Sequence, residues 1–367
     1  MLFQSQYRET DLAFVSRLLE DEGISWYFAH EAGSTQETLV LVDDLSQLRA
    51  LRAMGGGALA VVNDAVATSA VETVRRLDWS RRLVPRSITL RDYDPHSPGA
   101  TEGALTRTTG DGGGVFEYPA EYALRDWGGA QAAARDYGAR LSAIRGQELE
   151  GPHQGGEGES NATTLTPGYT FQLADHARDD LNTKLAVVLV EHEGAAPDEV
   201  RRNEAARKED RYRNRFTVIR ATGPWRPPRA TPRPRIEGAQ TATVTGPAGE
   251  EIYTDAQGRI KVRFHWDRQS YPDSESTCWV RVAQSWGGAG WGTQFIPRVG
   301  MEVLVTFLEG NPDRPVVTGC LYNGTHPPTF PVPGDKTRSG WRTQSSLGGG
   351  GFNELSFEDL TGAEQVY

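Results

Sequence analysis

The fold class is decided by residues 295–323, FIPRVGMEVLVTFLEGNPDRPVVTGCLYN. Every second residue from Val303 to Phe307 is a large apolar Val or Phe, which is typical of a strand with one apolar face. The segment Gly310–Asp313 then ends the strand, because Pro312 fixes φ for a turn and the flanking Asn and Asp side chains can bond to nearby backbone. The β pattern resumes at Arg314. The stretch therefore predicts a β-hairpin within a barrel or a sandwich.

Length and composition predict a soluble globular protein of two or three domains. The chain has 367 residues, of which 37% are hydrophobic and 24% are charged. Its 41 glycines and 21 prolines favour many turns, and therefore short strands over long helices. The net charge of −10 argues against nucleic acid as the main partner, because phosphate binding needs a basic surface.

The cysteines and the N-terminus predict a protein that folds in the cytoplasm. Cys278 and Cys320 are too few to form a disulfide framework, and they fit two reduced, buried thiols. A Cys278–Cys320 bridge is the alternative, since both fall in predicted strands. The N-terminal sequence MLFQSQYRETDLAF lacks a basic region followed by an apolar run, so no signal peptide is predicted. No window approaches about 18 consecutive apolar residues, so no transmembrane segment is expected.

The first 225 residues predict a mainly β domain with two helices. Residues 10–23 predict a helix with Thr10 as N-cap and Gly23 as its C-terminal stop. The alanine-rich residues 129–147 predict the second helix. Strands are expected at residues 24–28, 39–42, 71–79, 87–93, 168–173, 184–192 and 216–221. Loops are expected at the glycine-rich residues 95–114 and 152–161, and an exposed connection at the charged residues 195–210.

The segment RPPRATPRPRIE, residues 226–237, predicts a linker between domains. Its prolines cannot sit inside a helix or a sheet, so an extended, polyproline-like conformation is expected at residues 226–236. Its four arginines are interpreted as solvated. The boundary separates a first domain at residues 1–225 from a second domain at residues 237–330.

The second domain has the strand pattern of a small β-barrel. Five short strands with strong turns between them fit a Greek-key barrel of the OB type. An SH3-like barrel would have a similar number of strands, so both topologies stay open. The expected barrel core consists of alternating apolar residues, namely Val262, Phe264, Val280, Val282, Val303, Val305 and Phe307.

The tail at residues 331–367 changes character. It is rich in Gly, Ser and Thr until GGGGFNELSFED, where Leu355 and Phe357 alternate with polar residues. The pattern predicts a strand with a narrow apolar face. We expect this strand to have no partner within the chain, because few residues remain after it.

Signatures of catalysis and of metal binding are lacking in the sequence. It contains no G-x-S-x-G and no H-E-x-x-H, and its seven histidines occur singly. Its 49 carboxylates offer many apparent acid and base pairs, none of which the sequence singles out. We therefore predict no catalytic residues, no metal, no cofactor and no enzymatic activity in this segment.

Aromatic residues gather in the predicted barrel of the second domain. They are Phe264, Trp266, Trp279, Trp286, Trp291 and Phe295. OB barrels can use such residues to stack bases or sugars. The favoured interpretation is that they fill the core or a subunit interface, because basic residues do not accumulate around them. The glycine-rich residues 287–292 are interpreted as a site of close packing.

Long motifs, in order, resemble one known family. They are QYRETDLAFVSRLLEDEGISWYFAHE (residues 6–31), SITLRDYDP (87–95), PGYTFQLADH (167–176), VEHEG (190–194), YRNRFTVI (212–219), most of residues 226–323, and GGFNELSFEDLTGAEQVY (350–367). They resemble the VgrG spike proteins of bacterial type VI secretion, relatives of the hub and spike of contractile phage tails. The resemblance covers almost the whole chain.

The resemblance implies a homotrimer with a mechanical function. It implies a hub-like barrel domain with two packing helices, then an OB-fold barrel, then a neck that begins an intertwined trimeric β-helix. The implied neck or trimer-interface residues are Trp341, Phe352, Leu355, Phe357 and Val366. Implied partners are the Hcp tube ring at the hub end, a PAAR-repeat protein at the spike tip, effector proteins and baseplate components.

The resemblance also sets expectations for location and for alternatives. It implies assembly in the bacterial cytoplasm, then secretion by the type VI system to the outside or into target cells. It further implies that hub residues precede Met1 and that spike repeats follow Tyr367. The alternatives are the hub-spike of another contractile system or phage tail, a cell-wall hydrolase, and an OB-fold binder of oligosaccharide or nucleic acid.

Overall fold

The chain folds into two compact units. The structure is a computed structural model that describes residues 3–30, 33, 35–51, 57–62, 71–96, 98, 103–122, 131–151, 154–194, 212–222, 225–268 and 273–367. The larger unit is Thr10–Pro232, and the smaller unit joins Met1–Glu9 to Arg233–Tyr367. Among the described residues, no helix is both long and apolar enough to cross a membrane.

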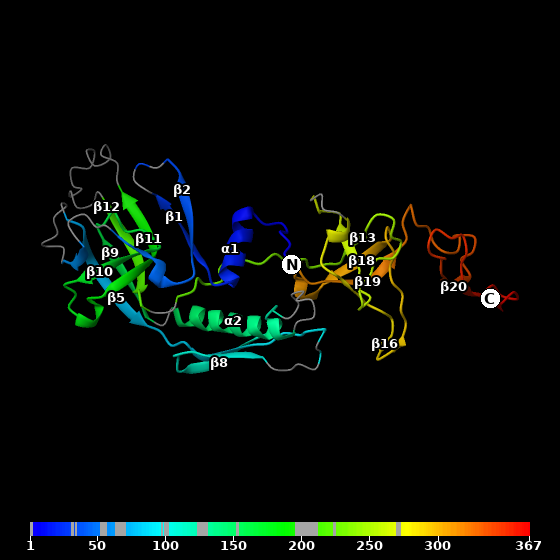
Figure 1. The fold of residues 1–367 in the computed structure, drawn as a ribbon, viewed down its shortest axis with the longest axis horizontal. Helices are drawn as coiled ribbons and strands as arrows, with labels where there is room; N and C mark the ends of the chain where they lie inside the picture. The colour runs from blue at the N-terminus through cyan, green and yellow to red at the C-terminus, as the bar shows by residue number, and fades with distance from the viewer. Residues whose placement is uncertain are drawn as a thin grey trace. The chain divides into compact units, whose positions relative to one another are not determined.

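A closed barrel of six strands forms one end of the larger unit (Figure 1). The order is β11-β12-β9-β5-β4-β10, β10 pairs with β11 to close the barrel, and β3 lies beside β10. Leucine and valine side chains fill the interior, where Leu59, Leu173, Leu185 and Val218 have no exposed surface. The strands are β3 (Arg49–Ala50), β4 (Ala58–Val61), β5 (Thr73–Arg81), β9 (Gln154–Ser160), β10 (Tyr169–Ala174), β11 (Lys184–Gly194) and β12 (Tyr212–Arg220).

Strand β9 was expected to be a loop, and that prediction was wrong. Its sequence, QGGEGES, has the composition of a loop, yet it pairs with both β5 and β12. Glycine is required there by space: a Cβ on Gly158 would lie 2.4 Å from the ring of Phe216. Strand β9 is therefore held by backbone pairing on both sides, and the Phe216 ring fills the space that a side chain at Gly158 would occupy.

A helix and a three-stranded sheet form a second layer of the larger unit. In the sheet, β6 (Pro85–Leu90) lies between antiparallel β7 (Ala104–Arg107) and parallel β8 (Gly112–Glu117). Helix α2 (Gln131–Glu150) lies along this sheet, as Figure 1 shows. Ile88 and Leu90 of β6 are buried against Tyr122 and Tyr137.

The expected loop at residues 95–114 is therefore partly wrong, because it contains β7 and the start of β8. Their glycine and threonine content does not show the alternation of a strand. Pairing with β6 on both sides makes these segments strands. Residues 129 and 130 of the expected second helix, and the expected connection at 195–210, lie outside the described residues.

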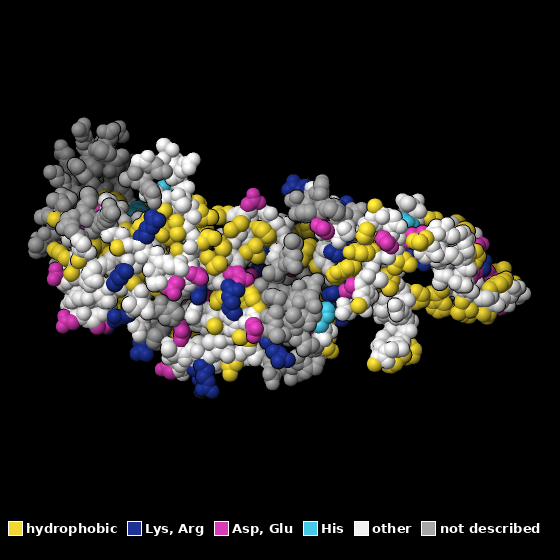
Figure 2. Space-filling view, viewed as in Figure 1, with side chains coloured by type: hydrophobic (Ala, Val, Ile, Leu, Met, Phe, Trp, Pro, Cys, Tyr) yellow, Lys and Arg dark blue, Asp and Glu magenta, His cyan; other side chains and the backbone are white. Residues whose placement is uncertain are grey.

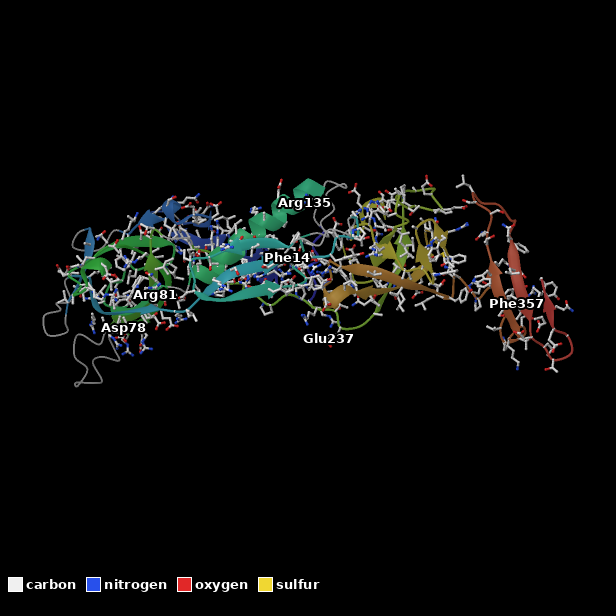
Figure 3. All side chains as sticks on the ribbon, turned by 90° about the horizontal axis from the view of Figure 1, so that it is seen from below. Phe14, Asp78, Arg81, Arg135, Glu237 and Phe357 are labelled. Atoms are coloured by element: carbon white, nitrogen blue, oxygen red, sulfur yellow. The ribbon has the colours of Figure 1, made fainter. Side chains whose placement is uncertain are left out.

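Helix α1 (Asp11–Asp21) is followed by the hairpin β1 (Ser25–His30) and β2 (Glu37–Val42). The Thr10 hydroxyl accepts a hydrogen bond from the Ala13 N–H at 3.2 Å, which confirms the predicted N-cap. At the other end, Gly23 has a φ of 69°, as a helix stop requires. Figure 3 marks Phe14 on this helix, with the Arg17 guanidinium 4.9 Å from its ring.

The smaller unit contains an OB barrel. Its strands are β13 (Gln240–Thr245), β14 (Lys261–Phe264), β15 (Arg281–Val282), β18 (Glu302–Phe307) and β19 (Pro315–Leu321). The sheet order is β14-β13-β18-β19-β15, with β15 parallel to β19, and the Ile260–Val280 bridge closes it. Numbered along the chain, this is the order 1-2-3-5-4-1 of an OB fold, which decides between the two barrel topologies. The predicted fold class is confirmed.

Two further β elements belong to the smaller unit. A short hairpin joins β16 (Gly287–Gly288) to β17 (Trp291–Gly292). Near the C-terminus, β21 (Glu354–Glu358) lies between β20 (Arg338–Arg342) and β22 (Gln365–Val366). The expectation that the Leu355 strand has no partner within the chain was wrong for its backbone. The chain reverses twice, so that two short neighbouring segments pair with β21.

Single turns of 3₁₀ helix occur at Leu45–Gln47, Asp179–Leu181, Asp273–Glu275 and Leu308–Gly310.

Candidate functional site

One face of the C-terminal sheet is apolar and uncovered. The register places Trp341 opposite Leu355, and Phe357 opposite Val366, so the four side chains share a face. They are 58%, 46%, 36% and 70% exposed, in the order Trp341, Leu355, Phe357, Val366. Figure 2 shows hydrophobic side chains at the surface of this C-terminal part, and Figure 3 marks Phe357. We call these four residues the apolar face.

The opposite face of the same sheet is polar and is the covered one. Glu354 bonds to both Arg338 and Arg342 at 2.5 Å, and Ser356 has no exposed surface. The Arg338 guanidinium also lies over the rings of Phe330, at 4.8 Å, and Tyr367, at 5.2 Å. A hydrogen bond from the Ser356 hydroxyl, followed by the Arg342 guanidinium, lowers the pKa of Glu354. Within one chain the sheet thus covers more of its charged side, where Ser356 is buried and the Glu354 side chain is 11% exposed, than of its apolar side, the reverse of the usual arrangement.

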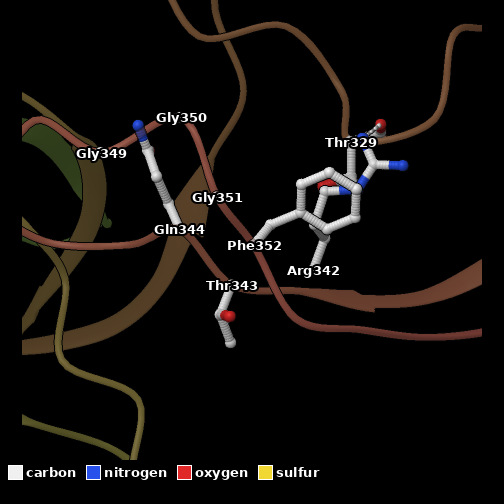
Figure 4. A pocket seen from close by; sticks show the side chains of 8 residues that line it. All are labelled: Thr329, Arg342, Thr343, Gln344, Gly349, Gly350, Gly351 and Phe352. Atoms are coloured by element: carbon white, nitrogen blue, oxygen red, sulfur yellow. Dashed lines mark hydrogen bonds between the residues drawn. The ribbon is translucent and has the colours of Figure 1, made fainter.

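Phe352 lies beside this sheet in a shallow pocket of about 260 Å³ (Figure 4). Arg342 stacks over its ring with 4.7 Å between guanidinium carbon and ring centre. The pocket is lined by Thr329, Arg342, Thr343, Gln344, Gly349, Gly350, Gly351 and Phe352. Its one charged group, Arg342, is already paired with Glu354, so the lining offers no general base for the hydroxyls of Thr329 and Thr343 and no proton-transfer pair.

The loop that contains this pocket is tied to the OB barrel. Arg298 donates to the Gln344 carbonyl at 2.8 Å, and Glu251 accepts from the Ser346 hydroxyl at 2.8 Å. Glu251 also accepts from the Gly348 N–H, at 2.5 Å. Hydrogen bonds from Ser346 and then from Gly348 lower the pKa of the Glu251 carboxyl. The neck is therefore joined to the barrel by side-chain bonds as well as by the chain.

The residues named as barrel core lie together in the structure. Five of the seven are at most 2% exposed, Phe307 is 9% exposed, and Val282 is partly buried against the cluster. Sequence reasoning missed Tyr7, which is also part of this core. Its ring packs edge-on against Trp266, with 5.3 Å between centres, and its hydroxyl accepts from Gln240 at 3.0 Å. Tyr7 lies more than 200 positions before its neighbours, so no local pattern could identify it.

The aromatic residues of the barrel divide into two groups. Phe264 is buried and stacks on Trp266 at 5.1 Å, and Trp279 packs against Tyr253 at 4.9 Å. By contrast, Trp286, Trp291 and Phe295 are 64%, 57% and 55% exposed. The two tryptophans contact each other edge-to-face across the β16–β17 hairpin at 5.1 Å. Phe264 and Trp266 thus belong to the core or pack against it, as the favoured interpretation holds, whereas Trp279 is partly buried beside Tyr253 and the second group is exposed.

The cysteines are both free thiols. Burial raises the pKa of Cys278 to about 12, so its thiol is uncharged at neutral pH. Cys320, on β19 opposite Val303, is exposed, so the expectation of a buried thiol was wrong there, although partial burial still raises the pKa of this thiol. Over the described residues, His, Cys, Asp and Glu side chains form no group of three or more that could hold a metal ion.

Two known families match the two units of the chain. The family described as "Phage tail baseplate hub (GPD)" matches residues 2–198, and "Type VI secretion system/phage-baseplate injector OB domain" matches residues 242–322. Barrel, OB fold and exposed neck sheet thus define a hub-and-injector protein of contractile tails. The chain belongs to the phage tail baseplate hub family and, within it, to the VgrG spike proteins of type VI secretion.

Curated relatives share about two fifths of the sequence. The type VI secretion system spike proteins VgrG4b and VgrG1a of Pseudomonas aeruginosa are 40% and 36% identical over 99% of this chain. The alignments cover 44% and 55% of those relatives, so the chain spans about half their length. The actin cross-linking toxin VgrG1 of Vibrio cholerae is 35% identical over all of this chain and 32% of its own length.

Solved structures share the fold. The c3393 protein of E. coli, described as a type VI secretion component with similarity to the T4 tail proteins gp27 and gp5, matches with a TM-score of 0.52. It is 22% identical over 86% of this chain and 62% of its own. The half-lidded Francisella PdpA–VgrG complex matches with a TM-score of 0.51 and 8% identity, over 99% of this chain and 62% of that chain.

Proposed function

We propose that this chain is a structural component of a trimeric spike in a type VI secretion system, which punctures target membranes and carries effectors. The observation that carries the proposal is the apolar face of Trp341, Leu355, Phe357 and Val366, exposed on a sheet whose polar side is already covered. A face of this kind needs apolar surface to cover it. Family membership supports the same reading.

Two further copies of the chain are the proposed cover. Three short sheets packed around a common axis would bury their apolar faces against one another and begin a three-stranded β-helix. Pairing across chains also removes the exposed strand edges that would otherwise invite aggregation. In such a rod, load is shared by many backbone hydrogen bonds, which suits puncturing. Phe352 and the glycine-rich residues 287–292 would then lie near neighbouring copies.

The domain plan and the remaining partners form part of the proposal. The hub-like domain, predicted at residues 1–225 but compact only from Thr10 onward, would dock on the Hcp tube ring, with residues 226–236 leading to the OB domain at 237–330 and the neck at 331–367. A PAAR-repeat protein would close the spike tip, and baseplate components would surround the hub. The names of two similar proteins support effector carriage. One is the Francisella PdpA–VgrG complex, and the other is the actin cross-linking toxin VgrG1.

The proposed role involves no chemistry in this segment and no nucleic acid. Assembly would take place in the bacterial cytoplasm, and the type VI system would export the product. The hub-spike of another contractile system is the main alternative, because the descriptions of both matching families mention phage baseplates. Neighbouring genes for a type VI sheath and tube, rather than for a phage head, would decide between them.

Light scattering on the protein expressed from its complete gene tests the proposal. A particle of three chains is expected. Residues 1–367 contribute 40.3 kDa to the mass of each chain. A stable monomer would contradict the trimeric spike. Turnover of purified peptidoglycan by residues 1–367 would instead support a cell-wall hydrolase and would contradict the claim that this segment is not catalytic.

A further inference from the structure

The first half of the proline-rich segment lies on the larger unit and is bonded to it. We call residues 226–231 the strap. Its arginines were interpreted as solvated, and for Arg226 and Arg229 that interpretation was wrong. Both side chains bond to the larger unit, which is rich in carboxylate and carbonyl acceptors at this place. A polyproline-like segment docks with little loss of conformational entropy, because prolines already restrict its backbone.

Arg226 joins three elements of the larger unit. Its Nη1 donates to the Gly23 carbonyl at 3.0 Å and to the Asp43 carbonyl at 2.6 Å, and its Nε donates to Gln147 at 2.7 Å. Gly23 follows α1, Asp43 follows β2, and Gln147 is on α2. The approach is close: a Cβ on Gly23 would lie 2.9 Å from Cδ of Arg226. One guanidinium thus holds the ends of α1 and β2 against α2.

The acidic C-terminal end of α1 is a place where the positive charge and N–H donors of Arg226 are favourable. The helix ends in Glu20-Asp21-Glu22, with no basic residue in its last turn. Carboxylates at the C-terminus of a helix are unfavourable, because the helix dipole is negative there. Arg226 brings a positive charge and N–H donors to this end. Arg140, which pairs with Glu22 at 2.9 Å, adds a second positive charge.

The rest of the strap repeats the pattern. Thr231 donates from its N–H and its hydroxyl to Glu20, at 2.9 Å and 2.7 Å. Arg229 lies between Glu117 of β8, at 3.0 Å, and Glu148 of α2, at 3.5 Å, which also pair with Arg145. Despite the cost of burial, hydrogen bonds from Arg145 and the charge of Arg229 lower the pKa of Glu117. The strap therefore offsets acidic charge on α1, α2 and β8 together.

We propose that the strap is a clasp built into the larger unit. When docked, it fixes the corner made by residues 19–25 and 42–44, where α1, β1 and β2 meet. When released, it loosens that corner while the six-stranded barrel stays folded. The chain leaves the larger unit through the strap. Release of the strap would therefore couple the order of the corner to the conformation of this exit segment. The inference does not depend on the trimer or on any partner.

Hydrogen exchange followed by mass spectrometry tests the clasp in the whole chain. Arg226→Ala removes the three-way contact. We expect amide exchange in residues 19–25 and 42–44 to rise at least about tenfold, while exchange in β11 and β12 changes by less than about twofold. Thr231→Val, a milder change at the other end of the strap, should raise exchange in residues 19–22 by a smaller factor. Arg235→Ala is the matched control, since Arg235 is an exposed arginine of the same proline-rich segment beyond the strap.

Trypsin gives a second readout of strap release. It does not cleave before proline, so Arg229–Ala230 is the one cleavable arginine bond within the strap, and its cleavage should be faster in Arg226→Ala than in the unchanged protein. Two results would overturn the proposal: unchanged exchange at the corner in both variants, or an equal rise throughout the larger unit, including outright unfolding. The second result would make the strap an ordinary part of the core rather than a local clasp.

Discussion

Trp341 and Leu355 lie opposite each other on β20 and β21, and both leave about half of their surface to solvent. On the other side of the same strands, Arg342 and Glu354 form an ion pair at 2.5 Å. The neck sheet thus covers charges within the chain and leaves its aromatic and aliphatic side chains for another surface. The proposed spike follows from this inversion, and so do the first two predictions.

A charge placed on the apolar face should weaken assembly. Phe357→Glu puts a carboxylate where the account expects apolar packing, and burying an unpaired charge is costly. We expect a shift from trimer toward monomer by at least about tenfold in the association constant, seen by analytical ultracentrifugation. Leu360→Glu is the control, because Leu360 is a 54% exposed leucine in the turn after β21. Equal effects of the two changes would contradict a specific role for the face.

Acid should loosen the neck sheet through Glu354. Its pKa in the folded chain lies below the ordinary value of 4.5, so the carboxylate adds stability that is fully present above pH 4.5. That stability is lost as the pH falls from 4.5 through the lowered pKa. We expect exchange of β20 and β21 amides to accelerate, relative to the intrinsic rate, in that range. Glu354→Gln should remove this pH dependence; if its profile matches that of the unchanged protein, Glu354 is not the group responsible.

Gly158 should be irreplaceable in the barrel of the larger unit. Gly158→Ala forces a methyl group against the Phe216 ring and the Arg76 carbonyl, so we expect a loss of about 1–3 kcal/mol in the free energy of unfolding. Gly155→Ala in the same strand is the control, because its Cβ would make an ordinary 3.4 Å contact with Val218. Denaturant unfolding, followed through a probe in the larger unit, measures both. A smaller loss for Gly158→Ala than for Gly155→Ala would show that the strand can shift to make room.

Tyr7 should contribute to the stability of the OB barrel although it belongs to the start of the chain. Tyr7→Ala leaves a cavity beside Trp266 and should cost about 3 kcal/mol. Tyr7→Phe keeps the ring and removes only the acceptor for Gln240, so it should cost about 1 kcal/mol. Unfolding of the smaller unit, followed by tryptophan fluorescence, provides the comparison. Equal stability of all three proteins would mean that residues 3–9 do not support the barrel.

Local pattern was sufficient for the strands whose own residues alternate. Val303, Val305 and Phe307 point into the OB core because their spacing has the period of a strand, and Thr10 caps α1 because its hydroxyl reaches the Ala13 N–H. Strand β9 could not be found in this way, because its glycines are set by the Phe216 ring from a distant strand. The same holds for Tyr7 and Arg226, whose partners are brought near only by the tertiary fold.

The apolar face shows the limit most clearly. Sequence alternation identified Leu355 and Phe357 as one face of a strand, and the resemblance indicated a contact with other copies. It did not reveal that β20 and β22 pair with this strand, nor that Glu354 and Ser356 are the covered side. Which side of a two-sided strand is covered depends on Arg338, Phe330 and Tyr367, which lie on other segments. Alternation alone cannot specify it.

Hydroxyl-radical footprinting of Trp341 in the assembled protein tests the central claim most directly. Trp341 is 58% exposed in the single chain, so a free neck would be oxidised readily. If three copies cover the apolar face, oxidation of Trp341 should be strongly slowed in the trimer and restored in Phe357→Glu. Oxidation of Trp341 in a verified trimer at the rate seen in the monomer would contradict the account.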